Sequence, residues 1–310
     1  MRLEVCYTPT QHMKKFILIG LDCAAPKLVF DRYLDRLPNI KGLMRDGVFG
    51  PLRSTDPPIT VPAWASMTTS KDPGQLGFYG FRNRPDTSYD TLVIATASDI
   101  RENTIWDILS HANLASLVVG VPQTYPPKPL RGLLVSSFLT PSKQSTWTYP
   151  ADWRERVDRA AGGNYIFDVE DFRGDDLEKL LFGIHEMTRA RFRAFRHFLK
   201  DDYSFNMMVE IGLDRMQHRF WRYSDTTHPL YDTKSPWKDA LGEYHELIDR
   251  EIGKILKYAD ENTDIMIVSD HGAKKMHGAI AINQFFINQG LLKLKTVPKN
   301  PAPLKTSMID

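Results

Sequence analysis

Four stretches of the chain are nearly continuous runs of apolar residues, and each run is about as long as a β-strand. They lie at residues 16–22, 115–122, 204–214 and 264–272. Runs of this kind are typical of strands covered on both faces, as in a parallel sheet. The intervening segments at 28–44, 104–112, 176–201, 235–260 and 280–292 have helical character, and 131–138 is a candidate for a further strand. This alternation predicts an α/β fold with a mostly parallel central sheet sandwiched between helices.

Length and composition agree with that architecture. The 310 residues, 42% of them hydrophobic, can form one large α/β domain or two ordinary ones. Residues 1–12 differ in pattern from the strand-like segment after them, and we interpret them as an N-terminal extension that need not be native, with Met13 as a candidate start. Residues 13–310 are the expected main domain, with a turn-rich peripheral insertion at about 139–175. Because the Lys- and Pro-rich residues 293–310 form no complete element, we expect this domain to be incomplete at its C-terminus.

The charge balance narrows the range of partners. With 40 basic and 38 acidic residues the net charge is +2, which gives no broad basic surface for a nucleic-acid polymer or an anionic membrane. No apolar run reaches the ~18 residues of a membrane span, and the first fifteen residues lack the apolar core of a signal peptide. Two cysteines, Cys6 and Cys23, argue against a disulfide framework. We therefore expect a cytoplasmic protein that acts on a small molecule. The pattern does not reveal its oligomeric state.

A proline-rich loop presents one hydroxyl in an unusual setting. Thr60 lies between Pro58 and Pro62, so it should occupy a rigid turn, and small residues that can open a helix follow it. The N-terminus of a helix offers unpaired N–H groups and a positive dipole end, which suit an anion such as phosphate. Thr60 is therefore a candidate nucleophile, although a buried threonine in a proline-rich loop is the simpler interpretation.

Three of the predicted strands end in an aspartate: Asp22, Asp214 and Asp270. A single aspartate there is commonly a helix N-cap, but the carboxyl ends of parallel strands share one edge, so all three carboxylates should converge. His271 directly follows one of them, and His218 lies four residues after another. Aspartate and histidine are ligands of zinc and related divalent metals. The spacing therefore predicts a metal site.

These motifs resemble the type I phosphodiesterase and nucleotide pyrophosphatase family of the alkaline phosphatase superfamily. Thr60, the Asp214-x-x-x-His218 pair and the segment 269–272 occur in the family's order along residues 16–292, and 80–84 and 120–127 resemble stretches of prokaryotic members. The resemblance implies hydrolysis of a small phosphoester or nucleotide through a phosphoryl-threonine intermediate. It also implies two divalent ions, Zn²⁺ or alternatively Mn²⁺. The implied ligands are Asp22, Thr60, Asp270 and His271 for one ion, and Asp214, His218 and a further histidine for the other.

Several assignments stay open. The further histidine is not placed: His277 is one candidate, a surface role is its simpler interpretation, and a residue beyond Asp310 is another candidate. Asn83 could donate to a phosphoryl oxygen or serve as a turn residue. Alternative functions are a phosphomonoesterase or a non-catalytic metal-binding or interaction domain. A sulfatase would need Cys or Ser at position 60.

Overall fold

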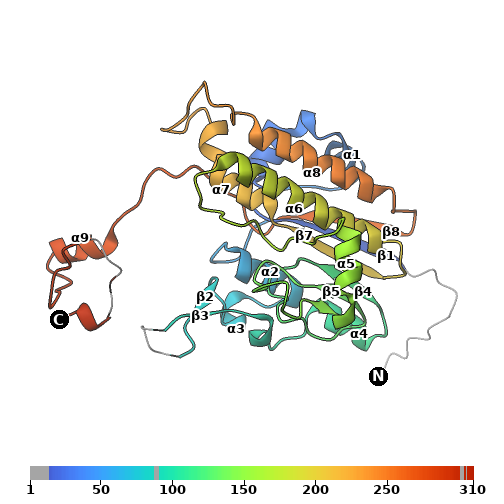
Figure 1. Ribbon diagram of the computed structural model, residues 1–310, viewed down its shortest axis with the longest axis horizontal. Coiled ribbons are helices and arrows are strands. Elements are labelled where there is room, and N and C mark those ends of the chain that lie inside the picture. Colours follow the sequence, from blue (N-terminus) through green and yellow to red (C-terminus); the bar gives the residue numbers. More distant parts are fainter. Residues whose placement is uncertain (1–13, 87–90, 301–303, 305) are drawn as a thin grey trace.

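A six-stranded sheet forms the centre of the protein (Figure 1). The computed structural model describes residues 14–86, 91–300, 304 and 306–310. The central strands are β1 (Lys15–Leu21), β4 (Ser116–Val119), β5 (Gly132–Val135), β6 (Thr148–Tyr149), β7 (Phe205–Glu210) and β8 (Thr263–Val268). Their order is β6-β5-β4-β7-β1-β8, and all neighbours are parallel except β5 and β6. The prediction of a mostly parallel sheet is confirmed.

Helices cover both faces of this sheet (Figure 1). The α-helices of the described residues are α1 (Pro38–Asp46), α2 (Thr60–Thr69), α3 (Pro73–Leu76), α4 (Ile105–His111), α5 (Arg154–Ala161), α6 (Leu177–Phe198), α7 (Gly212–Ser224), α8 (Ala240–Leu256) and α9 (Ile282–Asn288), and of these α9 lies away from the sheet (Figure 1). Along β1, Ile17 and Ile19 join the core under α6, α7 and α8, whereas Leu18 joins the core under α2 and α4. Successive side chains of a strand point to opposite faces, so an apolar run without alternation supplies both cores.

Proline accounts for one difference from the expected elements. The segment 28–44 is divided into a short π-helix (Lys27–Arg32), a 3-10 turn (Leu34–Arg36) and α1. Pro38 is the first residue of α1, and the residue before a proline is disfavoured in helical conformation. Asp249 of α8 accepts hydrogen bonds from the Asn39 and Ile40 N–H groups at 3.2 and 2.8 Å. The first turn of α1 is therefore satisfied by a neighbouring helix.

The turn-rich segment 139–175 contributes to the central sheet. It supplies β6, which pairs with β5 at the sheet edge, and α5, which packs beside α6. The segment is therefore tied to the main architecture at its edge. Residues 1–12, expected to be an extension, lie outside the described residues.

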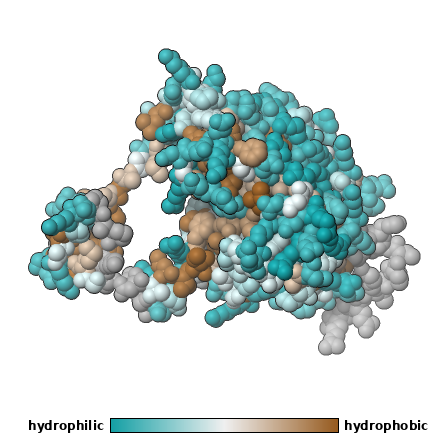
Figure 2. Space-filling view, viewed as in Figure 1, coloured by the Kyte–Doolittle hydropathy of each residue, from teal (hydrophilic) through white to brown (hydrophobic). Residues whose placement is uncertain are grey.

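The part of the chain that carries α9 lies away from the body of the protein (Figure 1). Its side chains include the exposed apolar residues Ile280, Phe285 and Leu291, and this segment shows hydrophobic surface (Figure 2). A pair of short strands, β2 (Arg82–Asn83) and β3 (Val93–Ile94), forms a separate antiparallel sheet. Within the described residues, none of the helices combines the length and the apolar character needed to cross a membrane.

Candidate active site

The carboxyl ends of β1 and β8 bring two aspartates together. Asp22 directly follows β1, Asp270 lies two residues beyond β8, and the two strands are neighbours in the sheet. Their side chains are 0% and 1% exposed. The Cys23 N–H group donates to Asp270 Oδ1 at 3.1 Å, and the Ala24 N–H group donates to Ser269 Oγ at 2.8 Å. Hydrogen bonds thus join the segments that follow β1 and β8 next to the two carboxylates.

Thr60 faces this pair from the start of α2. Its Oγ1 lies 3.4 Å from Asp22 Oδ1 and 3.1 Å from His271 Nε2. Thr60 is the first residue of the helix, and Pro62 falls within the first turn, where a missing N–H group removes no helical hydrogen bond. Thr60 was expected in a turn before a helix, and in the structure it is itself the first residue of that helix. We call Asp22, Thr60, Asp270 and His271 the strand cluster.

The two ring nitrogens of His271 have different surroundings. Nδ1 lies 3.1 Å from the Gly272 carbonyl oxygen, which can only accept, so Nδ1 carries the proton in this bond. Nε2 then presents its lone pair to Thr60 Oγ1, and it lies 3.3 Å from Asp270 Oδ2 and 3.7 Å from Asp22 Oδ1. Metal-binding histidines commonly donate their second N–H group to a carbonyl in this way. Nε2 is therefore prepared to bind a cation or to accept a proton.

The remaining two predicted ligands lie on α7. Asp214 was expected at the end of a strand, but β7 stops at Glu210 and Asp214 occupies the first turn of the helix, where the dipole favours a carboxylate. His218 Nε2 lies 3.4 Å from Asp214 Oδ1, so the four-residue spacing does place both on one side of the helix. We call these two residues the helix pair.

The helix pair and the strand cluster form one site. One ligand atom each from Asp22, Asp214 and His271 lies within 4.8 Å of the others. Asp214 thereby joins the helix pair to the strand cluster. All six residues that the sequence selected as ligands are brought together by these contacts.

The pKa values of the carboxylates shift in opposite directions in the two groups. Burial, reinforced by the charges of Asp270 and Asp214, raises the pKa of Asp22 well above its usual value. Burial also raises the pKa of Asp270, to about 7. Asp214 is buried too, but its hydrogen bond with His218 and the charges of His218 and Arg215 outweigh burial and lower its pKa. The strand cluster thus carries acids that lack a compensating cation, whereas Asp214 has one.

Trp64 is a site residue that sequence reasoning missed. Its indole N–H group donates to Asp22 Oδ2 at 2.8 Å from one turn along α2. The ring packs over Gly20 in β1, where an added Cβ atom would lie 2.4 Å from the Trp64 ring. A glycine inside a buried strand often marks such a close approach, so Gly20 was the available signal.

Arg215 and Asp168 were also missed. Arg215 follows Asp214 in α7, and its Nη1 donates to Asp214 Oδ2 at 2.7 Å. Asp168, in the turn-rich segment, accepts from Arg215 Nε at 2.9 Å and from Nη2 at 2.7 Å. No sequence spacing links Asp168 to the motif, because the contact exists only where the segment folds back on α7.

Two further candidates lie elsewhere. The Asn83 side chain accepts from the Tyr79 N–H group and donates to the Gly80 carbonyl oxygen, at 2.8 and 3.1 Å, which gives it a turn role in this structure. A role as donor to a phosphoryl oxygen stays a prediction. His277 is exposed and is not part of the group of mutually close ligand atoms found among the described residues.

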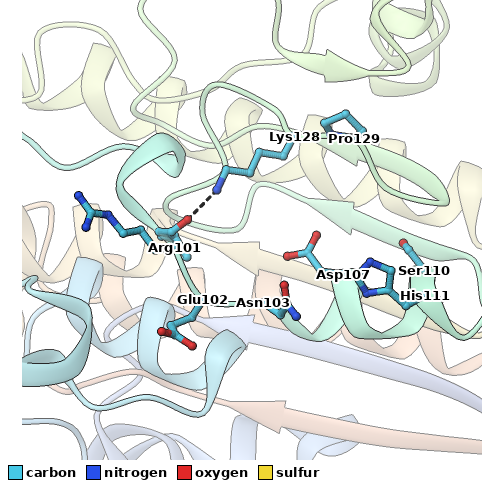
Figure 3. A pocket seen from close by; sticks show the side chains of 9 residues that line it. Arg101, Glu102, Asn103, Asp107, Ser110, His111, Lys128 and Pro129 are labelled. Atoms are coloured by element: carbon cyan, nitrogen blue, oxygen red, sulfur yellow. Dashed lines mark hydrogen bonds between the residues drawn. The ribbon is translucent and has the colours of Figure 1, made fainter.

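A separate hollow lies beside α4 (Figure 3). Its volume is about 360 Å³, and its lining includes Arg101, His111 and Lys128, with Lys128 Nζ donating to the Ile100 carbonyl oxygen at 2.7 Å. None of the six predicted ligands lines this hollow. The candidate chemistry is therefore at the sheet edge and outside this hollow.

Fold and site together define an α/β protein of the alkaline phosphatase type, with carboxylates and histidines gathered at the carboxyl ends of parallel strands. A family model described as type I phosphodiesterase / nucleotide pyrophosphatase matches residues 16–304, so the chain belongs to this family. The resemblance identified from the sequence motifs is confirmed. No curated protein sequence shows a significant match to the chain.

Solved structures share the fold at low sequence identity. Phosphonoacetate hydrolase from Sinorhizobium meliloti 1021 in complex with phosphonoformate is 17% identical, with a TM-score of 0.57. The same enzyme in complex with phosphonoacetate is 16% identical, with a TM-score of 0.58. Each alignment covers 93% of this chain and 66% of the hydrolase, so the chain spans just under two thirds of that protein's length. The 2-O GAG sulfatase BT1596 is 12% identical over 87% of this chain and 61% of its own, with a TM-score of 0.50.

Proposed function

We propose that the protein is a metal-dependent phosphoester hydrolase, with phosphodiesters or nucleotide pyrophosphates as its substrates and Thr60 as its nucleophile. The observation that carries this proposal is the convergence of three acids and two histidines at one edge of the sheet, with the Thr60 hydroxyl in contact with one acid and one histidine. Thr60 Oγ1 lies 3.1 Å from His271 Nε2, and a ligand atom of His271 is within 4.8 Å of one in Asp22 and one in Asp214. The family match supports the reaction class.

The residues present fit divalent metal ions. Asp270 Oδ2 is buried and has no hydrogen-bond partner among the described residues, as expected of an atom that binds a cation. Carboxylate oxygens and an imidazole lone pair suit Zn²⁺, and the oxygen-rich set also admits Mn²⁺. The strand cluster would hold one ion and the helix pair would contribute to a second. Such ions would supply positive charge that favours ionisation of a hydroxyl and stabilises charge on phosphoryl oxygens.

The chain's own residues account for the rest of the proposed reaction. Thr60 Oγ1 attacks phosphorus, the bond to the leaving oxygen breaks with its electron pair, and a phosphoryl-threonine forms; water then hydrolyses this ester. Asp22 Oδ1 and His271 Nε2 contact the hydroxyl and orient it, and because both groups would hold an ion, the Thr60 proton passes to water. The N–H groups of Thr60 and Val61 begin α2 without helical acceptors and can donate to a phosphoryl oxygen. Trp64 holds Asp22 in place.

The phosphorus class of substrate has further support. The structurally similar phosphonoacetate hydrolase was crystallised with phosphonoformate and with phosphonoacetate, both small phosphonates. Threonine at position 60 does not provide the cysteine or serine that a sulfatase nucleophile requires. A phosphomonoesterase is the second candidate, because Arg215 adds a positive charge beside the site and a monoester carries more negative charge than a diester.

Two chromogenic substrates test the proposal. The chain is freed of metal, loaded with Zn²⁺ or Mn²⁺, and assayed with bis-p-nitrophenyl phosphate and p-nitrophenyl phosphate, with a chelator-treated sample as control. We expect metal-dependent hydrolysis, faster for the diester. Faster hydrolysis of the monoester would favour the second candidate. Metal binding without turnover of either compound would contradict the enzymatic proposal and favour a non-catalytic metal-binding domain.

A further inference from the structure

Arg215 places a fixed positive charge at the margin of the site. It follows Asp214 directly in α7, and its side chain is 12% exposed. Burial opposes its charge, but the hydrogen bonds and charge of Asp168 outweigh burial and raise its pKa. The guanidinium therefore stays charged beside the helix pair while remaining partly open to solvent.

Both the guanidinium and the segment that holds it are constrained. Asp168 binds Nε and Nη2 through its two oxygens, which fixes the plane of the group. Phe138 and Phe172 lie with their ring centres 5.5 and 5.0 Å from the Arg215 guanidinium carbon. The Phe172 ring also meets the His218 ring edge-on at 5.8 Å. Arg215, Phe138 and Phe172 thus form one wall beside His218.

Arginines of α6 and α7 anchor the segment that carries Asp168. Arg193 Nε donates to the Ala161 carbonyl oxygen at 2.7 Å, Arg191 Nη2 donates to the Phe167 carbonyl oxygen at 2.9 Å, and Arg219 Nη2 donates to the Gly174 carbonyl oxygen at 2.6 Å. Charge-assisted hydrogen bonds of this kind are stronger than neutral ones. The wall is therefore organised before any ligand arrives, which reduces the entropic cost of binding.

The hydrogen-bonding capacity of Arg215 exceeds what its carboxylate partners use. A guanidinium has five N–H groups, and two are bonded to Asp168 and one to Asp214. Within the part of the chain that the structure describes, the other two have no protein acceptor. Asp168 and Asp214 both pair with Arg215, and the neighbouring acids Glu170 and Asp171 are exposed to solvent, where their charges are screened. The two spare N–H groups of Arg215 can donate to an oxyanion once a metal ion, as proposed above, compensates Asp214.

We propose that Arg215 is a specificity-determining residue that binds a second anionic group of the substrate, separate from the phosphorus centre that Thr60 attacks. This inference rests on the proposed function, and it narrows the substrate class to phosphoesters or phosphonate esters that carry an additional carboxylate or phosphoryl group. Phe138 and Phe172 flank the guanidinium, and Asp168 keeps it oriented.

Three p-nitrophenyl phosphonate esters test the proposal. The methylphosphonate ester has no second anionic group, the carboxymethylphosphonate ester adds a carboxylate, and the phosphonomethylphosphonate ester adds a phosphoryl group. For the metal-loaded wild-type chain we expect kcat/KM to be about tenfold to a hundredfold higher for at least one of the two doubly anionic esters, mainly through KM. The doubly anionic ester with the larger increase in kcat/KM over the methylphosphonate ester identifies which anion, carboxylate or phosphoryl, Arg215 binds.

Variants then assign the preference to Arg215. The ratio of doubly to singly anionic substrate should fall to about one in Arg215→Met and should be partly retained in Arg215→Lys. Arg222→Met, which removes an exposed α7 arginine that does not contact the wall segment, should keep the wild-type ratio. Because each ratio is taken within one variant, a loss of folded protein cancels.

A binding measurement complements the rates. Calorimetric titration of metal-loaded Thr60→Ala with methylphosphonate and carboxymethylphosphonate should show tighter binding of the latter, and this difference should vanish in Thr60→Ala/Arg215→Met. An unchanged preference in Arg215→Met, or none in the wild type, would overturn the inference while leaving hydrolysis of the methylphosphonate ester intact. Absence of turnover of that ester and of bis-p-nitrophenyl phosphate would overturn the proposed function and this inference together.

Discussion

The strand cluster and the helix pair contain the same two metal-ligating residue types, yet they are built differently. Asp22 and Asp270 are buried at the ends of adjacent strands, and the neighbouring backbone N–H groups hold them together. His218, by contrast, has a side chain that is 62% exposed, and Asp214 already has Arg215 as a cationic partner. The strand cluster is therefore rigid and short of positive charge, whereas the helix pair is open and already compensated.

This difference teaches where a cation is most needed. Several buried carboxylates without a cation are mutually destabilising, and a divalent ion removes that repulsion. The helix pair gains less from an ion, because His218 and Arg215 already stabilise the Asp214 charge. Among the described residues it also contributes only two of the three protein ligands typical of a catalytic zinc. We expect the strand cluster to bind metal first and more tightly.

Removing the nucleophile should have the largest effect. Thr60→Ala should lower kcat for bis-p-nitrophenyl phosphate by at least about a thousandfold, because the attacking oxygen is lost. The melting temperature should stay within about 4 °C of the wild type, since the hydroxyl makes one weak hydrogen bond and one contact with His271. Ser66→Ala, which removes another hydroxyl of α2, is the matched control and should remain active. An active Thr60→Ala protein would refute the assignment of the nucleophile.

The next-largest effect should be a difference in metal affinity between the strand cluster and the helix pair. Asp270→Asn should weaken Zn²⁺ binding to the tighter site by at least about a hundredfold, because even indirect partners of metal ligands change affinity by roughly tenfold to a hundredfold. Asp214→Asn should mainly weaken the second binding event. Calorimetric titration of the metal-free proteins measures both events. A greater loss of tight binding in Asp214→Asn would reverse the comparison.

The pH dependence of stability should distinguish the same two variants. Asp270 has a pKa of about 7 in the folded state against an ordinary value of 3.8, so the folded state binds more protons between these values and loses stability as pH rises through them. Asp270→Asn has no carboxyl group to ionise at this position, so its folded state does not lose this stability as pH rises. Without metal, its free energy of unfolding relative to the wild type should therefore rise by on the order of 2 kcal/mol from pH 5 to pH 8.

Asp214 provides the contrasting control for this experiment. Its pKa is lowered in the folded state, so its contribution to stability is present above its ordinary pKa and is lost only as pH falls through the lower folded value. Asp214→Asn should therefore be less stable than the wild type throughout pH 5 to pH 8, and this deficit should shrink as pH rises, because Asp214 is the partner that raises the pKa of His218. Urea unfolding in the presence of a chelator measures both variants. A flat difference for Asp270→Asn would contradict the prediction.

The smallest expected effect concerns the support of the strand cluster. Trp64→Phe keeps most of the ring that packs over Gly20 but removes the N–H group that binds Asp22. We expect about a tenfold loss in Zn²⁺ affinity or in kcat/KM, the usual scale for an outer partner of a metal ligand. Trp106→Phe, which changes a buried tryptophan of the same core outside the site, should leave both quantities unchanged. Equal losses in the two variants would show that packing, and not the hydrogen bond, is responsible.

Much of this architecture could be predicted from residue patterns, because the relevant physics is local or periodic. Uninterrupted apolar runs such as 16–21 predicted strands covered on both faces, and their alternation with helices predicted the parallel sheet. The four-residue spacing of Asp214 and His218 predicted a shared helix face, since a helix brings residues i and i+4 together. The convergence of Asp22 and Asp270 followed from the common direction of parallel strands.

Tertiary structure alone decided the features that depend on long-range contacts. Asp168 meets Arg215 only because the turn-rich segment folds back onto α7, and no local pattern encodes a bond between residues so far apart in the chain. The contact between Trp64 and Asp22 depends on how closely α2 packs against β1, which Gly20 permits. The opposite pKa shifts of Asp270 and Asp214 arise from burial and from neighbouring charges, which the three-dimensional arrangement sets. The amino-acid sequence by itself thus determined the six candidate ligands at the sheet edge, because strand direction and helix period are local properties. The packing around them brought in Trp64, Arg215 and Asp168, and it decided which ligands are held rigid, which are compensated and which need a cation.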